Sequence, residues 1–218
     1  MITKDIDLIY YINLDHRIDR QQNFLQWIDP FLNNDEKHKL IRISGIYDIE
    51  KGYIGCMKSH ILALQTFLSH PTANNCIIFE DDFFPINKET FCDQLNLIFD
   101  EKVDFDLIML SYNVAEENIF SVPSSPSFIK KCNFSYTTSG YLLTKNFASK
   151  LLNCFQECLQ LCIQEENYTK RCTESFYLDV YWNTLMQKTE KWYLIYPRLG
   201  KQYENFSDVL KKVVDYNC

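Results

Sequence analysis

The sequence predicts an α/β fold with a mainly parallel central sheet, and two observations lead to that class. Short apolar runs typical of buried strands alternate with segments of helical periodicity through the first half of the 218 residues. Strands and helices that alternate in this way form βαβ units, in which helices flank the sheet. Such a sheet offers a ligand crevice at the carboxyl ends of its strands, where we expect the functional site.

The first half of the chain contains four predicted strands, and a helix is predicted after each of the first three. The strands are residues 8–12, 40–43, 76–79 and 105–110. The helices follow from apolar residues spaced to face a core: Phe24, Leu25, Trp27 and Ile28; Ile54, Met57, Ile61, Leu64 and Leu68; Phe91, Leu95, Ile98 and Phe99. Asp15 is the expected N-cap of the first helix.

The second half begins with a break in this alternation. Residues 112–135, with Val-Pro-Ser-Ser-Pro-Ser at their centre, predict a long lid or recognition loop. The later predictions are a β-prone segment at 135–144, a helix with Phe147, Leu151, Cys154, Phe155, Cys158 and Cys162 on one face, a helix at 174–185, a strand at 192–197, and a short helix within 202–210 capped by Ser207. The three cysteines are interpreted as small core residues, with a soft-metal site as the alternative.

Composition predicts one reduced, intracellular domain over residues 1–218. The 46% hydrophobic content is enough for a sizeable core, and nine cysteines, an odd number without C-x-x-C spacing, do not indicate a disulfide framework or a zinc site. A formal charge of −7 argues against a nucleic-acid surface. With no secretion signal and no apolar run of membrane-spanning length, we expect a cytoplasmic protein.

Three consecutive carboxylates, Glu80, Asp81 and Asp82, follow the apolar run of residues 76–79. Like charges this close repel one another unless a cation or hydrogen-bond donors compensate them. One interpretation is a solvated strand end that faces water. The other is a divalent-metal site at the carboxyl end of a central strand.

Arg17 and Arg20 lie three residues apart in the first turn of a predicted helix and would project side by side. Two guanidinium groups there suit a pyrophosphate, because each guanidinium can donate a pair of hydrogen bonds to it. The alternative is a pair of surface arginines that bridge to Asp15 and Asp19.

Lys58, Ser59 and His60 lie off the apolar stripe, near the expected start of the second helix. Unpaired amides and the helix dipole favour anions at such a position, so a phosphate or ribose contact is one interpretation. A capping or packed role for His60 is the other.

Asp179 stands among aromatic residues in the segment 174–185. A carboxylate partly desolvated by Tyr and Trp neighbours has a raised pKa, which suits a general base. A structural capping or pairing role is the alternative.

Taken in order along the chain, these motifs resemble glycosyltransferase family 25. The residues that carry the resemblance are Ile12-Asn13-Leu14 with Arg17 and Arg20; Gly55-Cys56 with Ser59-His60; Ile78-Phe79-Glu80-Asp81-Asp82; Asp179 with Trp182; and Pro197 and Gln202 with Phe206-Ser207-Asp208. That family includes bacterial lipooligosaccharide galactosyltransferases and collagen galactosyltransferases, and similar proteins occur in giant viruses. The resemblance implies a GT-A fold, a Rossmann-like sheet that binds a nucleotide sugar, in a bacterial cytoplasm or, for a viral member, the host cytoplasm or virion.

The resemblance also implies roles for individual residues. Asp82 would contact Mn²⁺ or Mg²⁺ directly, Glu80 would act through water or ribose, and Asp81 would lie near the donor sugar. Asp179 is the implied base of an inverting reaction. The residues implied on the nucleotide-sugar side are Asn13, Leu14, Arg17, Arg20, Lys58, Ser59 and His60. No histidine follows His70, so Gln202 or a water would complete the metal shell.

The activity implied is transfer of a hexose from UDP-galactose or UDP-glucose to a glycan, a glycosylated protein or another hydroxylated acceptor. Residues 1–111 would bind the nucleotide sugar and residues 112–218 the acceptor. A catalytically degenerate domain that binds a nucleotide or glycan without turnover is the alternative. A metal-dependent nucleotidyltransferase or phosphatase fits less well, because the chain has only five glycines and no glycine-rich phosphate loop.

Overall fold

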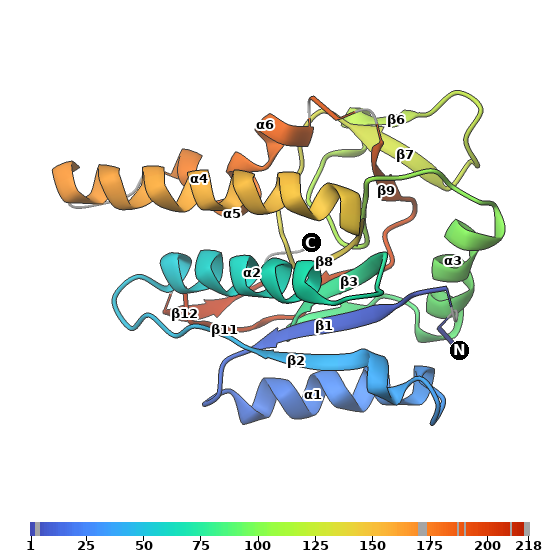
Figure 1. The fold of residues 1–218 in the computed structure, drawn as a ribbon, viewed down its shortest axis with the longest axis horizontal. Helices are drawn as coiled ribbons and strands as arrows, with labels where there is room; N and C mark the ends of the chain where they lie inside the picture. Colours follow the sequence, from blue (N-terminus) through green and yellow to red (C-terminus); the bar gives the residue numbers. More distant parts are fainter. Residues whose placement is uncertain (3–4, 170–173, 187, 190, 210, 216–218) are drawn as a thin grey trace.

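The computed structural model describes residues 1–2, 5–169, 174–186, 188–189, 191–209 and 211–215, and its core is a sheet with helices on both sides (Figure 1). The strands are β1 (Leu8–Asn13), β2 (Leu40–Ser44), β3 (Asn75–Glu80), β4 (Phe83–Pro85), β5 (Leu107–Met109), β6 (Ile119–Ser121), β7 (Ile129–Cys132), β8 (Gly140–Thr144), β9 (Trp192–Ile195), β10 (Gly200–Gln202), β11 (Asn205–Ser207) and β12 (Lys212–Val214). The α-helices are α1 (Ile18–Ile28), α2 (Gly52–Ser69), α3 (Lys88–Asp100), α4 (Lys145–Thr169), α5 (Leu178–Tyr181) and α6 (Asn183–Met186). Short 3-10 helices are η1 (Asp29–Phe31), η2 (Lys37–Lys39), η3 (Glu116–Asn118) and η4 (Glu174–Phe176).

Eight strands form the central sheet in the order β2-β1-β3-β8-β5-β9-β7-β6. Strand β1 pairs in parallel with both β2 and β3, and β5 pairs in parallel with β9. Strands β8 and β7 run antiparallel to both of their neighbours, so the other six strands share one direction. The prediction of a mainly parallel sheet is confirmed, with two reversed strands inserted.

Helices cover both faces of the sheet, and strand β3 is buried between them. Its side chains alternate: Cys76 and Ile78 join the core beneath α2 and α4, while Ile77 and Phe79 join the core beneath α1 and α3. Helices α2 and α4 lie side by side on the first face, and α1 lies on the other (Figure 1). Each fully buried Ile or Phe of this strand contributes about 1.5–3 kcal/mol to folding. The apolar run is thus a central strand, as predicted.

Helix α1 begins without the predicted cap. Arg17 occupies the N-cap position and makes no side-chain capping hydrogen bond. The expected cap, Asp15, instead accepts hydrogen bonds from Arg42 Nη2 at 2.6 Å and Ser44 Oγ at 2.8 Å. These two partners lie on β2, so Asp15 ties the loop after β1 to the neighbouring strand.

Residues 112–135 contain more regular structure than a lid loop would. They include η3 and the antiparallel pair β6–β7, and β7 extends the sheet beside β9. Their Ser/Pro-rich centre forms only the connection between these two strands. The unpaired edge of β9 explains the difference, because a strand edge offers hydrogen bonds to any extended segment nearby.

Two predicted helices in the last fifty residues also differ from the structure. Residues 174–185 divide into η4, α5 and α6, and the Asn183 side chain donates to the carbonyls of Asp179 and Val180, which ends α5. Residues 202–209 form no helix: β10 pairs with β4, and β11 pairs with β12. Ser207 therefore ends a strand instead of capping a helix.

Helix α4 carries the three cysteines on its buried face, as predicted. Cys154 and Cys158 are free thiols, whereas Cys162 is disulfide-bonded, which corrects the expectation that every cysteine is reduced. A disulfide sulfur offers no thiolate to a metal, so the soft-metal alternative for this trio is not supported. Neither α4 nor another helix in the described part of the chain has both the length and the apolar character needed to cross a membrane.

Candidate active site

The three carboxylates lie at the carboxyl edge of the sheet. Glu80 is the last residue of β3 and stands in register with Ile12 of β1. The amide of Asp81 donates to the carbonyl of Ile12 at 3.1 Å, which fixes the turn after the strand. Asp81 and Asp82 are only 4% and 3% exposed, so the interpretation of the triplet as a solvated strand end is wrong.

Asp81 is held by an amide and a guanidinium. Asn13 Nδ2 donates to its Oδ2 at 2.7 Å, and Arg20 Nη1 donates to its Oδ1 at 2.9 Å. Asn13 in turn accepts a hydrogen bond from Arg42 Nε at 2.9 Å. Burial raises the pKa of Asp81 in spite of these partners. Asn13 thus orients Asp81. Asp81 and Arg20 line a cavity at this edge of the sheet, here called the first cavity.

Asp82 carries negative charge that its neighbours compensate only in part. Gln202 Nε2 donates to its Oδ1 at 3.2 Å, and Arg20 Nη1 lies 3.3 Å from its Oδ2. Burial, together with the charge of the two neighbouring carboxylates, raises the pKa of Asp82 to about 7 although Arg20 opposes the shift. A further cation would relieve this excess of negative charge, and carboxylate oxygens are the ligands that Mn²⁺ and Mg²⁺ prefer. The donor set therefore fits a hard divalent cation.

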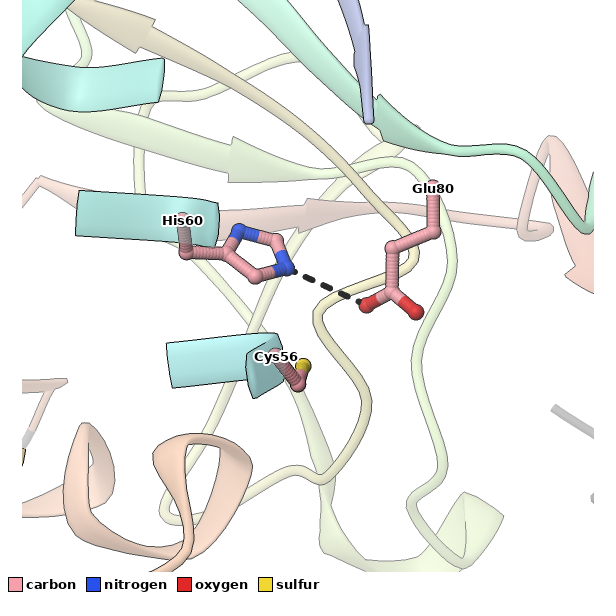
Figure 2. Close-up of side chains that lie close together, drawn as sticks. All are labelled: Cys56, His60 and Glu80. Carbon is pink, nitrogen blue, oxygen red and sulfur yellow. Dashed lines mark hydrogen bonds and ion pairs between the residues drawn. The ribbon is translucent and has the colours of Figure 1, made fainter. Parts of the chain in front are cut away.

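Glu80 faces a different set of partners. Its Oε1 accepts a hydrogen bond from Thr138 Oγ1 at 2.7 Å and lies 3.3 Å from His60 Nε2 (Figure 2). Burial raises the pKa of Glu80, but His60 and Thr138 together hold it below its ordinary value. His60 is 1% exposed, and its Nδ1 lies 3.0 Å from the Tyr141 hydroxyl. His60 is thus a packed residue whose ring is fixed at both nitrogens.

The predicted anion-binding trio on α2 is divided by the structure. It lies two turns inside the helix and not at its start, so the unpaired amides of Gly52 and its neighbours are elsewhere. Ser59 Oγ donates to the carbonyl of Gly55 at 2.7 Å and accepts from the Ile46 amide at 2.8 Å. Ser59 and His60 line the first cavity, whereas Lys58 lines neither cavity, and its contact with a donor stays a prediction.

Arg17 and Arg20 bind different side chains. Arg17 bonds Asp19 through Nε and Nη2 at 3.0 and 2.9 Å and bonds Asp208 through Nη1 at 2.6 Å, so its pairing agrees in part with the surface-arginine alternative. Arg20 turns toward the carboxylates and also contacts the Asn205 side chain. The Nε of Arg20 is buried and has no partner among the described residues. Arg20 therefore has one unsatisfied donor beside the first cavity.

A covering segment, residues 205–209, closes the first cavity. Arg17 and Arg20 both donate to the carbonyl of Phe206, at 3.1 and 3.0 Å. On the opposite side the covering segment packs on the first residue of α2, where a Cβ on Gly52 would lie 2.7 Å from the carbonyl oxygen of Asp208. Only glycine allows this approach, so the covering segment and α2 meet backbone to backbone.

Two adjoining cavities meet at Glu80, while Asp81 and Asp82 line only the first. The first has a volume of about 110 Å³ and lies between Leu14, Arg20, Asp81, Asp82 and the covering segment. The second has a volume of about 600 Å³ and lies between α2, the residues before β8, and α5. Four residues line both cavities: Cys56, Glu80, Gln202 and Val209.

Asp179 lies in the first turn of α5 and lines the second cavity. Its Oδ2 accepts a hydrogen bond from the Thr137 amide at 3.1 Å. Burial raises the pKa of Asp179; the Thr137 hydrogen bond opposes this shift and the charge of Glu80 adds to it. The raised pKa expected from the sequence is found, and a carboxylate in this state suits proton acceptance near neutral pH.

Three residues that shape the site carry no recognisable signal in the sequence. Thr138 and Tyr141 belong to a β-prone segment, and Asn205 belongs to the tail that was predicted as helix. Cys56 does carry a signal that the prediction left unused. It lies one helical turn before His60, so both side chains project from the same face of α2.

The sheet, with its carboxylate edge, places this protein in the class of GT-A folds. Among solved structures, a glycosyltransferase involved in glycosylation of the major capsid of PBCV-1 is similar over 94% of this chain and 95% of its own, with 8% identity and a TM-score of 0.56. A197 from STIV covers 95% of this chain and 92% of its own at 12% identity and a TM-score of 0.49. A Drosophila galactosyltransferase 7 in complex with manganese, UDP-Gal and xylobiose is similar over 67% of this chain and 52% of its own, with 10% identity and a TM-score of 0.38.

The chain belongs to glycosyltransferase family 25 (LPS biosynthesis protein), whose family model matches residues 32–166. The match contains the carboxylate triplet and the helix that carries His60. Arg20 and Asp179 lie outside it, so their assignment depends on the geometry described above. No curated protein sequence matches this chain.

Proposed function

We propose that this glycosyltransferase is a hexosyltransferase that moves galactose or glucose from a UDP-sugar to a glycan or another hydroxylated acceptor with inversion at the anomeric carbon. One observation carries the proposal: Asp81 and Asp82 line the first of two adjoining cavities, Glu80 lines both, and a separate carboxylate, Asp179, lines only the second. Inverting transfer needs the leaving diphosphate and the base on opposite faces of the sugar. Two cavities that share a wall at Glu80 and Gln202 supply such an arrangement.

On the donor side, Asp82 with Glu80 would hold Mn²⁺ or Mg²⁺, which when bound neutralises the charge that develops on the diphosphate. Arg20 lies against Asp81 and Asp82, and its Nε, which has no partner in the described part of the chain, suits a phosphate oxygen. Leu14 and Ser59 line the same cavity. We assign the nucleotide sugar to residues 1–111, completed by the covering segment.

On the acceptor side, Asp179 would take the proton of the attacking hydroxyl. The hydroxyl oxygen forms a bond to the anomeric carbon, the bond from that carbon to the diphosphate oxygen breaks, and UDP leaves with the electron pair. The Thr137 amide holds Asp179 Oδ2 in place during this step. Tyr136, Tyr177 and Asn113 line the same cavity and would contact the acceptor, which is why we assign residues 112–218 to that substrate.

The experiment is a panel of UDP-sugars, incubated with the purified protein and Mn²⁺ with and without a chelator, in which UDP release and transfer to glycan acceptors are measured. We expect UDP release with UDP-galactose or UDP-glucose that the chelator suppresses. Asp82→Ala should lose this activity, and Asp93→Ala, which removes an exposed carboxylate on α3, should retain it. A donor that binds by calorimetry without hydrolysis or transfer under any of these conditions would replace the proposal with the alternative, a nucleotide- or glycan-binding module.

A further inference from the structure

Cys56, His60 and Glu80 form a cluster that the proposed reaction leaves unused as a unit. Cys56 and His60 project from successive turns of α2, and Glu80 faces them from the end of β3 (Figure 2). One ligand atom from each residue, a sulfur, a ring nitrogen and a carboxylate oxygen, lies within 4.8 Å of the other two. Figure 2 shows the sulfur of Cys56 directed to the same space as the imidazole Nε2 and the carboxylate.

We propose that Cys56, His60 and Glu80 bind a zinc ion. Thiolate, imidazole and carboxylate are the three ligand types that zinc takes in proteins, at about 2.3 Å for sulfur and about 2.0–2.2 Å for nitrogen and oxygen. Tetrahedral geometry places a nitrogen and an oxygen at such distances about 3.3 Å apart. The observed separation of His60 Nε2 and Glu80 Oε1 is 3.3 Å, so these two ligands need little movement to accept the ion.

The residues behind the cluster are also those of a metal site. Metal-binding histidines are oriented through their second ring nitrogen, and metal-binding carboxylates are themselves hydrogen-bonded. Here His60 Nδ1 lies 3.0 Å from the Tyr141 hydroxyl, and Glu80 accepts from Thr138 Oγ1 at 2.7 Å. The orientation of His60 and Glu80 is therefore fixed before any ion binds.

Three protein ligands leave a fourth tetrahedral position, and the cavities indicate where it points. Cys56 and Glu80 line both cavities, so the open position faces the space where they join. A water or a substrate oxygen would complete the coordination there, as at zinc sites that keep an open position. The proposed ion is distinct from the one expected at Asp82, and Glu80 lies between the two: its Oε1 faces His60, whereas the oxygens of Asp82 contact Gln202 and Arg20.

The ligand set separates the two ions chemically. A site with one thiolate and one imidazole favours zinc or cobalt, whereas a site of carboxylate and phosphate oxygens favours Mn²⁺ or Mg²⁺. The absorption spectrum of bound Co²⁺ identifies a thiolate ligand, because a cobalt–sulfur bond gives a band that oxygen and nitrogen ligands do not give. This property allows the thiolate site to be followed while the Asp82 site stays silent.

The test strips the full-length protein with a chelator, titrates it with Co²⁺ and then displaces the cobalt with Zn²⁺. We expect the sulfur-to-cobalt band to saturate at one equivalent and to vanish on addition of zinc. Cys56→Ser should abolish the band, and Cys132→Ser, which alters a free half-buried thiol on β7, should retain it. Tyr141→Phe should weaken affinity about 10- to 100-fold, and Asp82→Asn should leave the band intact.

X-ray absorption at the zinc edge, on wild-type protein loaded with one equivalent of zinc, gives a second readout that needs no variant. We expect one sulfur ligand at about 2.3 Å together with nitrogen and oxygen ligands. A shell without sulfur would overturn the proposal, as would a band that survives in Cys56→Ser. Loss of the band in Asp82→Asn would show that the two proposed metal sites are one.

Discussion

Replacement of Asp179 by asparagine separates its proposed catalytic role from a structural one. Asparagine has the same shape and can still accept the hydrogen bond that the Thr137 amide gives to Oδ2 at 3.1 Å. It cannot take a proton from an acceptor hydroxyl. A general base contributes about 10²–10⁴ in rate, or about 2.7–5.4 kcal/mol at 1.36 kcal/mol for each factor of ten. We therefore expect Asp179→Asn to lower kcat by that factor.

The effect on stability has the opposite sign. Burial raises the folded-state pKa of Asp179 above the unfolded value, so folding becomes less favourable as pH rises through the ordinary aspartate range and up to the folded-state pKa. Above both values the wild-type protein holds a charge in a partly buried position, and asparagine removes it. At pH 7 the variant should be at least as stable as the wild type by urea denaturation.

The assay is single-turnover transfer as a function of pH, with denaturation curves on the same samples. In the wild type, the acid limb of kcat/KM should lie above the ordinary aspartate pKa of about 3.9, because the base must be deprotonated and its pKa is raised. Asp179→Asn should lose this limb. Glu174→Gln, which alters another carboxylate of the same cavity, is the matched control. A kcat for Asp179→Asn within threefold of wild type would refute the assignment.

Three further changes have expected outcomes. Arg20→Met leaves buried carboxylates without their guanidinium and should lower the free energy of unfolding by about 3–5 kcal/mol, with a smaller loss when Mn²⁺ is present, as measured by urea denaturation. Gly200→Ala would place a Cβ 2.0 Å from the Phe83 ring and should lower the free energy of unfolding by about 1–3 kcal/mol or more. Gly45→Ala, whose nearest contact is the end of a side chain at 3.1 Å, should lower it less. Equal losses of stability in the two variants would contradict this account. Asp208→Asn removes the partly buried ion pair with Arg17, which contributes about 1 kcal/mol. Association of the donor should therefore become about fivefold faster in stopped-flow measurements. An unchanged association rate would contradict a role for this ion pair in holding the covering segment closed.

The central strands could be predicted because their signal is local. The run of residues 76–79 is buried on both faces, and its apolar character is continuous for that reason. The tail was predicted wrongly because its structure depends on distant partners: β10 pairs with β4, and Arg17 and Arg20 bind the carbonyl of Phe206. No pattern within the tail encodes those contacts.

The candidate site divides in the same way. The charge of Glu80, Asp81 and Asp82 is visible in the sequence, and so is its position after a strand. The different partners of the three carboxylates are not visible in the sequence. Arg20 binds the two aspartates, whereas His60 faces Glu80. Those pairings follow from the register of β1 with β3 and from the packing of α2, which only the fold sets.

The covering segment has a consequence for the order in which substrates bind. The first cavity, at about 110 Å³, is smaller than the roughly 300–1,000 Å³ of pockets that enclose small ligands. A UDP-sugar is larger than this cavity, so we expect residues 205–209 to move outward when it binds. Because Val209 also lines the second cavity, the return of the covering segment over a bound donor rebuilds a wall of the acceptor site. Steady-state kinetics should accordingly show compulsory order, with the nucleotide sugar binding first and UDP leaving last.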